Sequence, residues 1–420
     1  MLLRVPVGPG VPIAEALLIA ALAFSFMAPS FAVRAGISIL PFALWWLYGI
    51  CRILADVPAG GAWAFRDGSQ VIDSLFLIVG TCWLTAKNWS ALQRWVVPFV
   101  VVATFYGLSY VARASIQAWS PKIAAPAGYD AALFSYTNTS ALLLLVAAYL
   151  ITSKAAFSGT RIALACLLVA FTVAMFQART VYLQVFATTC WFVVLRRRET
   201  GKWMMALVLI FFTLAAIPVF DLHIQGRLGQ QPSLEFLSKH VGSIVGIEAE
   251  GVEGAAGGVD LRSAWWEHIW GKALSRPEYL LFGRGFGQPL TDFTVSGGVP
   301  VREPHNSFIS VFARLGLLGI ALWIWMHWEL WRAWFKAYRS ARLVRWVTAE
   351  RFLILFSVFF ILVAICALGE DAFEKPFNAV PYYFFWGVVI RIAAELARAH
   401  TIPAAVIPVE VSSATVSPQQ

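Results

Sequence analysis

The chain of 420 residues is 60% hydrophobic and only 13% charged, and it contains 19 Trp and 32 Phe. An average soluble domain is far less apolar, so this composition excludes a water-soluble globular protein. The net charge of +9 comes from basic residues that fall mainly between apolar runs, which is typical of membrane proteins. We therefore expect a lipid bilayer, and no nucleic acid, among its partners.

Apolar stretches of roughly 20 residues, the length that crosses a bilayer core, recur along the chain, and many contain no charge. They predict an all-α polytopic membrane protein with about 11–12 transmembrane helices. The first stretch follows Arg4 and also fits a signal-peptide core, but a second stretch follows almost at once and favours a span. The expected spans are 11–28, 36–54, 70–86, 95–112, 131–151, 161–178, 180–195, 203–220, 314–333, 352–369 and 377–394.

Lysine and arginine are unevenly distributed between the loops on the two sides of these spans. One side carries seventeen of them and the short loops of the other side carry six, and the richer side is expected to be cytoplasmic. The long segment 221–304 lies on the poorer side, so we expect a large periplasmic loop there. The chain then divides into N-terminal spans (1–220), this loop, C-terminal spans (305–398) and a disordered cytoplasmic tail (399–420).

The long loop contains a glycine-rich stretch followed by a helical pattern. The stretch 251–258 reads GVEGAAGG and is expected to be flexible. From Leu261 the sequence LRSAWWEHIWGKALSRPEYL predicts an amphipathic helix that Pro277 ends, and its tryptophans fit a helix at the membrane surface. Such a helix can still direct Arg262 towards a site. The residues near helical spacing are Arg262, Trp266, Ile269, Trp270 and Ala273.

The sequence LFGRGFGQ comes next, with Gly283, Gly285 and Gly287 around Arg284. A glycine-rich phosphate cradle would need a strand before it and a helix after it in a βαβ unit, and neither is expected in this chain. We therefore predict a tight turn that lets the backbone approach a neighbouring segment closely.

His305 lies where the long loop meets the next span, in the sequence REPHNSFISVF. An imidazole is the usual general base near neutral pH, while a structural role at the helix start is the alternative. In the following span, Gly316 and Gly319 are spaced for close helix packing. The acidic residues of the last outward loop, Glu370, Asp371 and Glu374, are expected to form a solvated loop end, although they could touch an acceptor.

Arg179 lies in FQARTVYLQVF, between two spans joined by almost no loop and on the same side as His305. An arginine this close to hydrocarbon is costly without an anionic partner. The partner can be the phosphate of a substrate, or a lipid headgroup that takes no part in catalysis. The sequence leaves both interpretations open.

The run PHNSFISVFARLGLLGI, preceded by LRSAWWEHIW and PEYLLFGRGFG, resembles the O-antigen ligase and polymerase superfamily of bacterial envelope enzymes. This resemblance implies a glycosyltransferase of the inner membrane whose active site faces the periplasm and acts on glycans linked to undecaprenyl diphosphate. It places the family's histidine on His305, its loop arginine on Arg262 and its arginine between two middle spans on Arg179. At the last position this chain reads QART, where the family more usually has an SRG-like run.

These residues suit the implied chemistry. His305 can activate an acceptor hydroxyl as a base, and Arg179 and Arg262 can stabilise the charge that grows on the leaving diphosphate. The chain has no Asp-x-Asp pair and no clustered His/Cys ligands, so we expect no metal and no cofactor. Candidates for substrate binding are Arg284, Arg302, Asn306 and Trp266.

Several functions remain open within and outside the superfamily. Polymerases of this kind commonly have two sizeable outward loops, whereas this chain has one, so a ligase that attaches glycan to a lipid A-core or similar acceptor is favoured over an O-antigen or exopolysaccharide polymerase. A transporter of lipid-linked glycans would be expected to show repeat symmetry and polar groups at the membrane midplane. A non-catalytic membrane scaffold is the remaining alternative.

Overall fold

The computed structural model describes residues 25–124, 139–152, 159–195, 234–242, 253–295 and 299–401, with a few shorter pieces (4–5, 11–12, 17–18, 21–22, 130–132, 136, 208, 210, 212 and 226–227). Of the expected spans, 203–220 lies largely outside these residues, and 11–28 is described only in short pieces. The expected cytoplasmic tail also lies outside them beyond residue 401.

Within the described residues, the secondary structure is helical apart from three antiparallel pairs of very short strands. Six helices are long and apolar enough to cross a membrane, and three apolar segments are shorter. These nine segments coincide with nine of the eleven expected spans, which confirms an all-α polytopic membrane protein. The long helices are α3 (Leu40–Gly60), α7 (Ala86–Leu108) continued by η1 (Ser109–Ala112) and α8 (Arg113–Trp119), α10 (Gly159–Phe176), α16 (Ser307–Leu343), α17 (Val347–Cys366) and α18 (Pro376–Thr401); the shorter segments are α5 (Ser69–Ser74) with α6 (Phe76–Trp83), α9 (Thr139–Thr152) and α11 (Arg179–Leu195).

The remaining elements are short or lie outside the apolar bundle. The helices among them are α2 (Ala28–Arg34), α4 (Ala62–Asp67), α13 (Leu234–Gly242), α14 (Glu253–Leu274), α15 (Pro277–Phe282) and η4 (Ala372–Glu374). The strands pair as β1 (Arg4–Val5) with β2 (Val11–Pro12), β3 (Lys122–Ala124) with β4 (Asp130–Ala132), and β5 (Thr294–Val295) with β6 (Val299–Pro300).

Helix α7 shows how the sequence produces a lipid-facing surface. Its side chains Trp95, Phe99, Val102 and Phe105 recur at helical spacing, and all are more than half exposed. Exposure to water of so many large apolar groups along one stripe would be costly, whereas lipid tails solvate them. This face of α7 therefore fits contact with acyl chains.

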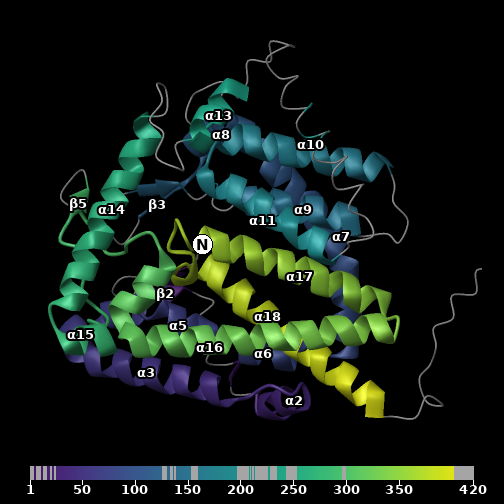
Figure 1. The fold of residues 1–420 in the computed structure, drawn as a ribbon, viewed down its shortest axis with the longest axis horizontal. Helices are drawn as coiled ribbons and strands as arrows, with labels where there is room; N and C mark the ends of the chain where they lie inside the picture. Colours follow the sequence, from purple (N-terminus) through teal and green to yellow (C-terminus); the bar gives the residue numbers. More distant parts are fainter. Residues whose placement is uncertain are drawn as a thin grey trace, which may run out of the picture.

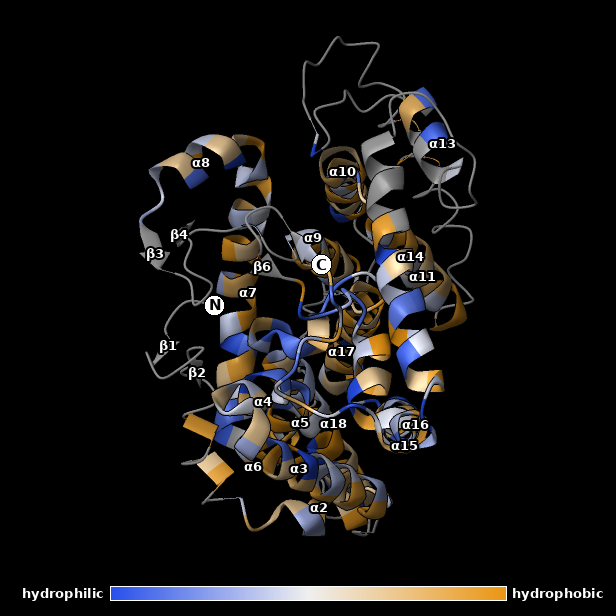
Figure 2. Cartoon of the chain, turned by 90° about the vertical axis from the view of Figure 1, so that its left-hand side faces the viewer, coloured by the Kyte–Doolittle hydropathy of each residue, from blue (hydrophilic) through white to orange (hydrophobic). Residues whose placement is uncertain are grey.

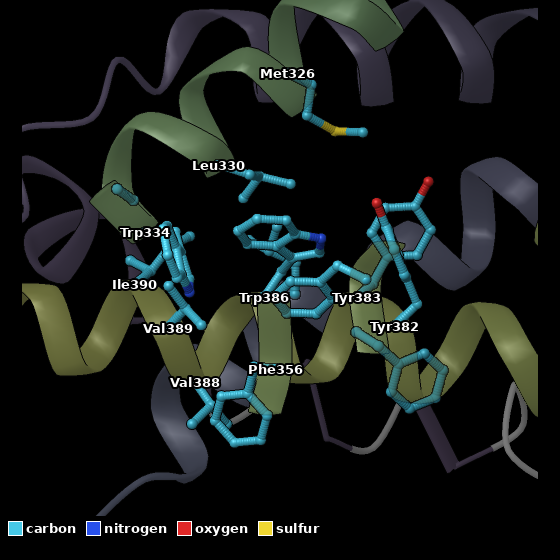
Figure 3. Packing of buried hydrophobic residues seen from close by; sticks show 14 of the residues in the cluster. Met326, Leu330, Trp334, Phe356, Tyr382, Tyr383, Trp386, Val388, Val389 and Ile390 are labelled. Atoms are coloured by element: carbon cyan, nitrogen blue, oxygen red, sulfur yellow. The ribbon is translucent and has the colours of Figure 1, made fainter. Parts of the chain in front are cut away.

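The core of the bundle is built from α16, α17 and α18 (Figure 3). The Trp386 ring stacks on Phe360 with centroids 3.8 Å apart and planes at 9°, and the buried indole N–H of Trp334 donates to the carbonyl oxygen of Leu353 at 2.7 Å. Helix α18 also packs on α6, where a Cβ at Gly80 would collide with the backbone of Phe384. Small residues allow this close approach, as is usual between helices in membranes.

Helices α14 and α15 lie across one end of the bundle (Figure 1), the end where α11, α16 and α18 begin and where α17 ends. Helix α14 begins at Glu253, so the expectation of a flexible stretch at 251–258 is wrong for residues 253–258. The other half of this helix packs on α16, where the Trp270 ring lies 4.4 Å from that of Phe312, centroid to centroid.

Helix α16 is kinked at Gly316, whose φ of +68° and ψ of −166° are not helical. A Cβ at Gly316 would collide with the backbone of Leu281 and Phe282 at the end of α15. The prediction of close packing at Gly316 is thus confirmed, although the close neighbour is the end of a short helix and the glycine is also required for its left-handed backbone. Gly319 approaches Leu315 of its own helix instead.

Candidate functional site

His305 occupies the sharp corner between the long loop and α16, with a φ of +50° that a non-glycine residue rarely adopts. The next residue, Asn306, caps the helix, because its Oδ1 accepts hydrogen bonds from the backbone N–H groups of Phe308 (3.0 Å) and Ile309 (3.2 Å). Its Nδ2 donates to the carbonyl oxygen of Leu368 at 3.1 Å. Both ends of this amide make internal contacts, so the structure places Asn306 as a helix cap that fixes His305 beside the turn after α17.

The imidazole of His305 faces the carboxylates of that turn. Its Nδ1 lies 3.1 Å from Asp371 Oδ2 and 3.8 Å from Glu370 Oε2. The hydrogen bond and charge of Asp371 raise the pKa of His305 above its ordinary value, although partial burial opposes the shift. For Asp371, burial favours the neutral acid, but the contact with His305 outweighs it and lowers the pKa of the carboxyl. The two groups therefore favour an ion pair.

The prediction that these acidic residues form a solvated loop end is wrong for Asp371 and Glu374, whereas 38% of the Glu370 side chain is exposed. Asp371 is only 6% exposed, and Glu374 Oε2 accepts a hydrogen bond from Ser307 Oγ at 2.6 Å. Burial, together with the nearby carboxylates of Asp371 and Glu303, raises the pKa of Glu374 to about 8. The three acids lie within five residues of the sequence, 370–374, and this clustering was the available signal that they have a structural or chemical role.

Arg262 projects from α14 towards the same turn. Its Nη2 lies 4.0 Å from Glu370 Oε1, and about a third of the side chain (35%) remains exposed. Because Glu370 also approaches His305, one carboxylate connects Arg262 with the imidazole. The contact with Arg262 is long for an ion pair, so this guanidinium keeps some capacity to bind another anion.

Arg179 is the first residue of α11, directly after a sharp turn in which Gln177 has a φ of +43°. The neighbouring Thr180 packs at Gly369 of the α17–η4 turn: a Cβ at that glycine would lie 3.1 Å from Thr180 Cγ2 and 3.8 Å from Arg262 Nη1. The start of α11, Arg262 and the turn that holds His305 therefore meet in one place. The structure thus brings together the segments that carry His305, Arg262 and Arg179.

Two tryptophans of α14 pack beside this cluster. Trp266 donates its indole N–H to the carbonyl oxygen of Pro304 at 2.9 Å, and the buried ring of Trp265 lies 5.7 Å from that of His305, centroid to centroid. The sequence analysis selected Trp266, four residues after Arg262, and missed Trp265. A spacing of three residues also lies on the same helix face, so the pattern alone could not separate the two. Together they fix the backbone before His305 and provide an aromatic wall.

Arg284 and Arg302 make their contacts elsewhere on this end of the bundle. Arg284 donates from Nη1 to the carbonyl oxygen of Leu290 at 3.1 Å, while Arg302 pairs with the buried Asp67 at 2.6 Å and lies over the ring of Trp63. The turn around Arg284 has positive φ at Gly283, Gly285 and Gly287 (74°, 86° and 90°), which confirms the predicted tight turn. Both guanidinium groups thus contact the protein itself.

The view onto this end of the bundle (Figure 2) shows hydrophilic loop segments in the centre, between α14 and α4, with the apolar helices behind them. Charged side chains of both signs gather here, which is the arrangement expected for a polar site at a membrane surface. Residues 164–324 match the family model described as O-antigen ligase. No curated protein matches the chain. The matched segment includes Arg179, Arg262 and His305, whereas Asp371 lies beyond it.

Proposed function

We propose that the chain, whose residues 164–324 match the O-antigen ligase family model, is a glycosyltransferase that moves a glycan from undecaprenyl diphosphate to an acceptor hydroxyl at the periplasmic face of the bacterial inner membrane. The observation that carries the proposal is the imidazole of His305, paired with Asp371 and located at the same turn as Arg262 and the start of α11. The proposed base, Arg262 and the segment that begins with Arg179 thus lie where the loop joins the bundle.

In this proposal His305 is the general base. Its Nδ1 faces Asp371 at 3.1 Å, so Nε2 is the nitrogen left for the acceptor hydroxyl. A carboxylate orients the catalytic histidine of Ser-His-Asp enzymes in the same way. The acceptor oxygen forms a bond to the anomeric carbon as the bond from that carbon to the diphosphate oxygen breaks. The hydroxyl proton passes to His305, and undecaprenyl diphosphate leaves with the bonding electron pair.

The arginines are proposed to stabilise the leaving diphosphate. Arg262 is partly exposed and only loosely paired with Glu370, so a diphosphate with more charge can replace that carboxylate as its partner. Arg179 begins α11, where the helix dipole adds a positive potential to its guanidinium. Arg302 and Arg284 are not assigned this role here, because their guanidinium groups contact Asp67 and the backbone of Leu290.

A ligase and a polymerase of this superfamily differ in the acceptor that receives the glycan. The single long outward segment 221–304 supports a ligase that attaches glycan to a lipid A-core, with a polymerase of repeat units as the alternative. Deletion of the gene separates them: loss of a ligase leaves long polymer on undecaprenyl diphosphate and none on the lipid A-core. Loss of a polymerase leaves single repeat units on the normal acceptor, and this result would reject the ligase.

The direct test is reconstitution of the purified protein with a lipid-diphosphate glycan and candidate acceptors. Transfer of glycan to an acceptor supports the proposal, and His305→Ala is expected to abolish transfer while membrane insertion stays intact, because the side chain lies at a loop boundary and about a third of it (37%) is exposed. Full transfer by His305→Ala would reject the role of general base. Movement of lipid-linked glycan across vesicles without transfer would favour a transporter.

A further inference from the structure

Asp67, the last residue of α4, has a fully buried carboxylate that holds three separate segments. Its Oδ2 accepts hydrogen bonds from Arg302 Nη2 (2.6 Å) and the backbone N–H of Gly287 (3.1 Å), and it lies 3.2 Å from Arg314 Nη2. A buried carboxylate is costly unless it is paired and hydrogen-bonded this fully. The proposed reaction does not use this residue, so the reason for its burial must be sought in what it holds.

Both arginines connect Asp67 with the segment just before His305. Arg302 lies three residues before the histidine and also donates to the carbonyl oxygen of Gly287 at 3.0 Å. Arg314, fully buried in α16, donates from Nη2 to Glu303 Oε1 at 2.8 Å, and Glu303 Oε2 accepts from Ser310 Oγ at 3.1 Å. The side chains of residues 302 and 303 are thus both fixed by groups that Asp67 holds.

This restraint matters because the backbone of His305 is in the left-handed region, with a φ of +50°. A non-glycine residue keeps such a conformation only where its surroundings impose it. On the helix side the restraint is the Asn306 cap and the bond from Ser307 N–H to the carbonyl oxygen of Ala367 at 2.9 Å. On the loop side, Trp266 donates to the carbonyl oxygen of Pro304 at 2.9 Å, and the side chains of Arg302 and Glu303 provide the anchors that depend on Asp67.

We propose that Asp67 is a positioning residue for His305: through Arg302, and through Arg314 and Glu303, it fixes the 302–304 backbone so that the imidazole faces Asp371 and the acceptor. This inference rests on the proposed function, and Asp67 itself touches no substrate. The sequence separation between Asp67 and Arg302 is 235 residues, so α4 and residues 302–304 are brought together only by the fold.

Asp56 offers a matched control because it binds the same glycine turn. Its Oδ2 accepts from the backbone N–H of Phe286 at 2.8 Å and pairs with Arg52 at 3.3 Å. Asp56 and Asp67 therefore both anchor the turn, but the contacts to Arg302 and Arg314 are made by Asp67. If anchoring of the turn alone were important, substitution of either residue would have the same effect.

The test compares purified Asp67→Asn, Asp67→Glu and Asp56→Asn in glycan transfer with a lipid-diphosphate glycan donor. Since a displaced catalytic group costs rate more than affinity, Asp67→Asn should lower kcat by about 10- to 100-fold and change the KM for the donor less than about threefold. Asp67→Glu should recover part of kcat, and Asp56→Asn should keep kcat within about threefold of the wild type. Wild-type kcat in Asp67→Asn, or an equal loss in Asp56→Asn, would overturn the inference.

Two further measurements keep the test informative. If Asp67→Asn does not fold, Arg302→Lys, which keeps the charge but loses the planar fork, should show the same loss of kcat with little change in KM, and unchanged kcat would overturn the inference. Acylation of His305 by diethylpyrocarbonate, followed by mass spectrometry, reports imidazole exposure without any transfer. Absence of transfer by the wild-type protein would reject the proposed function alone. In that situation, a changed acylation rate in Asp67→Asn still supports the positioning of His305 by Asp67, and an unchanged rate would overturn it.

Discussion

The contact between His305 and Asp371 controls the protonation of the proposed base. Only a neutral imidazole accepts a proton, and Asp371 raises the pKa of His305, so the active fraction increases as the pH rises through that raised value. The rate of transfer should therefore climb with pH on its acidic limb. The ion pair both orients the ring and reduces the fraction of base at lower pH.

Substitution of Asp371 by Asn removes the charge that stabilises the imidazolium. We expect the acidic limb of the pH–rate profile to move to lower pH, because the pKa of His305 falls, and we expect kcat at the optimum to fall roughly 10- to 100-fold, because ring orientation is lost. The control Glu370→Gln, whose carboxylate is 3.8 Å from the imidazole, should move the limb less. A limb that stays in place in Asp371→Asn would show that another group controls it.

Arg262 distinguishes the importance of charge from that of geometry. Its partly exposed guanidinium lies 4.0 Å from Glu370, and Lys at this position keeps the charge without the bidentate fork. Arg262→Lys should retain part of the transfer activity and Arg262→Glu essentially none, measured as kcat/KM for the lipid-linked donor. Equal activities of the two variants would contradict a role in diphosphate binding.

At the scale of elements, the kink of α16 allows α15 to reach the start of that helix. Gly316 combines a positive φ with the backbone of Leu281 and Phe282 where a Cβ would lie. Gly316→Ala should destabilise the protein by at least about 1–3 kcal/mol, seen as a lower Tm in detergent. Gly271→Ala is the control: Gly271 lies within α14 with open space at its Cβ, so roughly 0.5–1 kcal/mol of stabilisation is expected. A Tm unchanged by Gly316→Ala would refute the role of the kink.

The sequence predicted elements well where hydrophobicity determined them. Nine apolar runs became helices at the expected places, because a bilayer requires this length and composition. It failed at 253–258, where glycines suggested flexibility and the structure instead has the first turns of α14. It also gave no indication that Gly316 would break its helix, since a positive φ depends on the neighbour that passes close by.

The same limit applied to the candidate site. His305, Arg262 and Arg179 could be proposed from their types and from the family resemblance, and their segments meet in the structure. Asp371 and Asp67 could not be assigned, because their importance comes from partners far away in the chain, at His305 and at Arg302. Burial of a carboxylate depends on the whole fold and leaves no local pattern in the sequence.

At the scale of the whole molecule, the site is accessible to periplasmic substrates only if the end that carries α14 and α15 faces outwards. The distribution of basic residues supports this orientation: at the opposite end, Arg342 lies in the last turn of α16, Arg345 in the turn that follows and Arg351 near the start of α17. Such clusters are retained on the cytoplasmic side during insertion. The donor's diphosphate would then reach Arg262 from the outer leaflet.

Single cysteines in a cysteine-free background test this orientation in intact cells whose outer membrane has been permeabilised. Glu278→Cys, on α15, should react with an impermeant thiol reagent, whereas Leu343→Cys, at the opposite end of the bundle, should react only after the inner membrane is permeabilised as well. Both positions suit the test because the Glu278 side chain is 59% exposed and Leu343 is 77% exposed, so burial cannot explain a lack of reaction. The reversed pattern would place the His305 cluster in the cytoplasm. A base and arginines at that face could not act on a glycan presented in the periplasm, and the proposed function would be rejected together with the orientation.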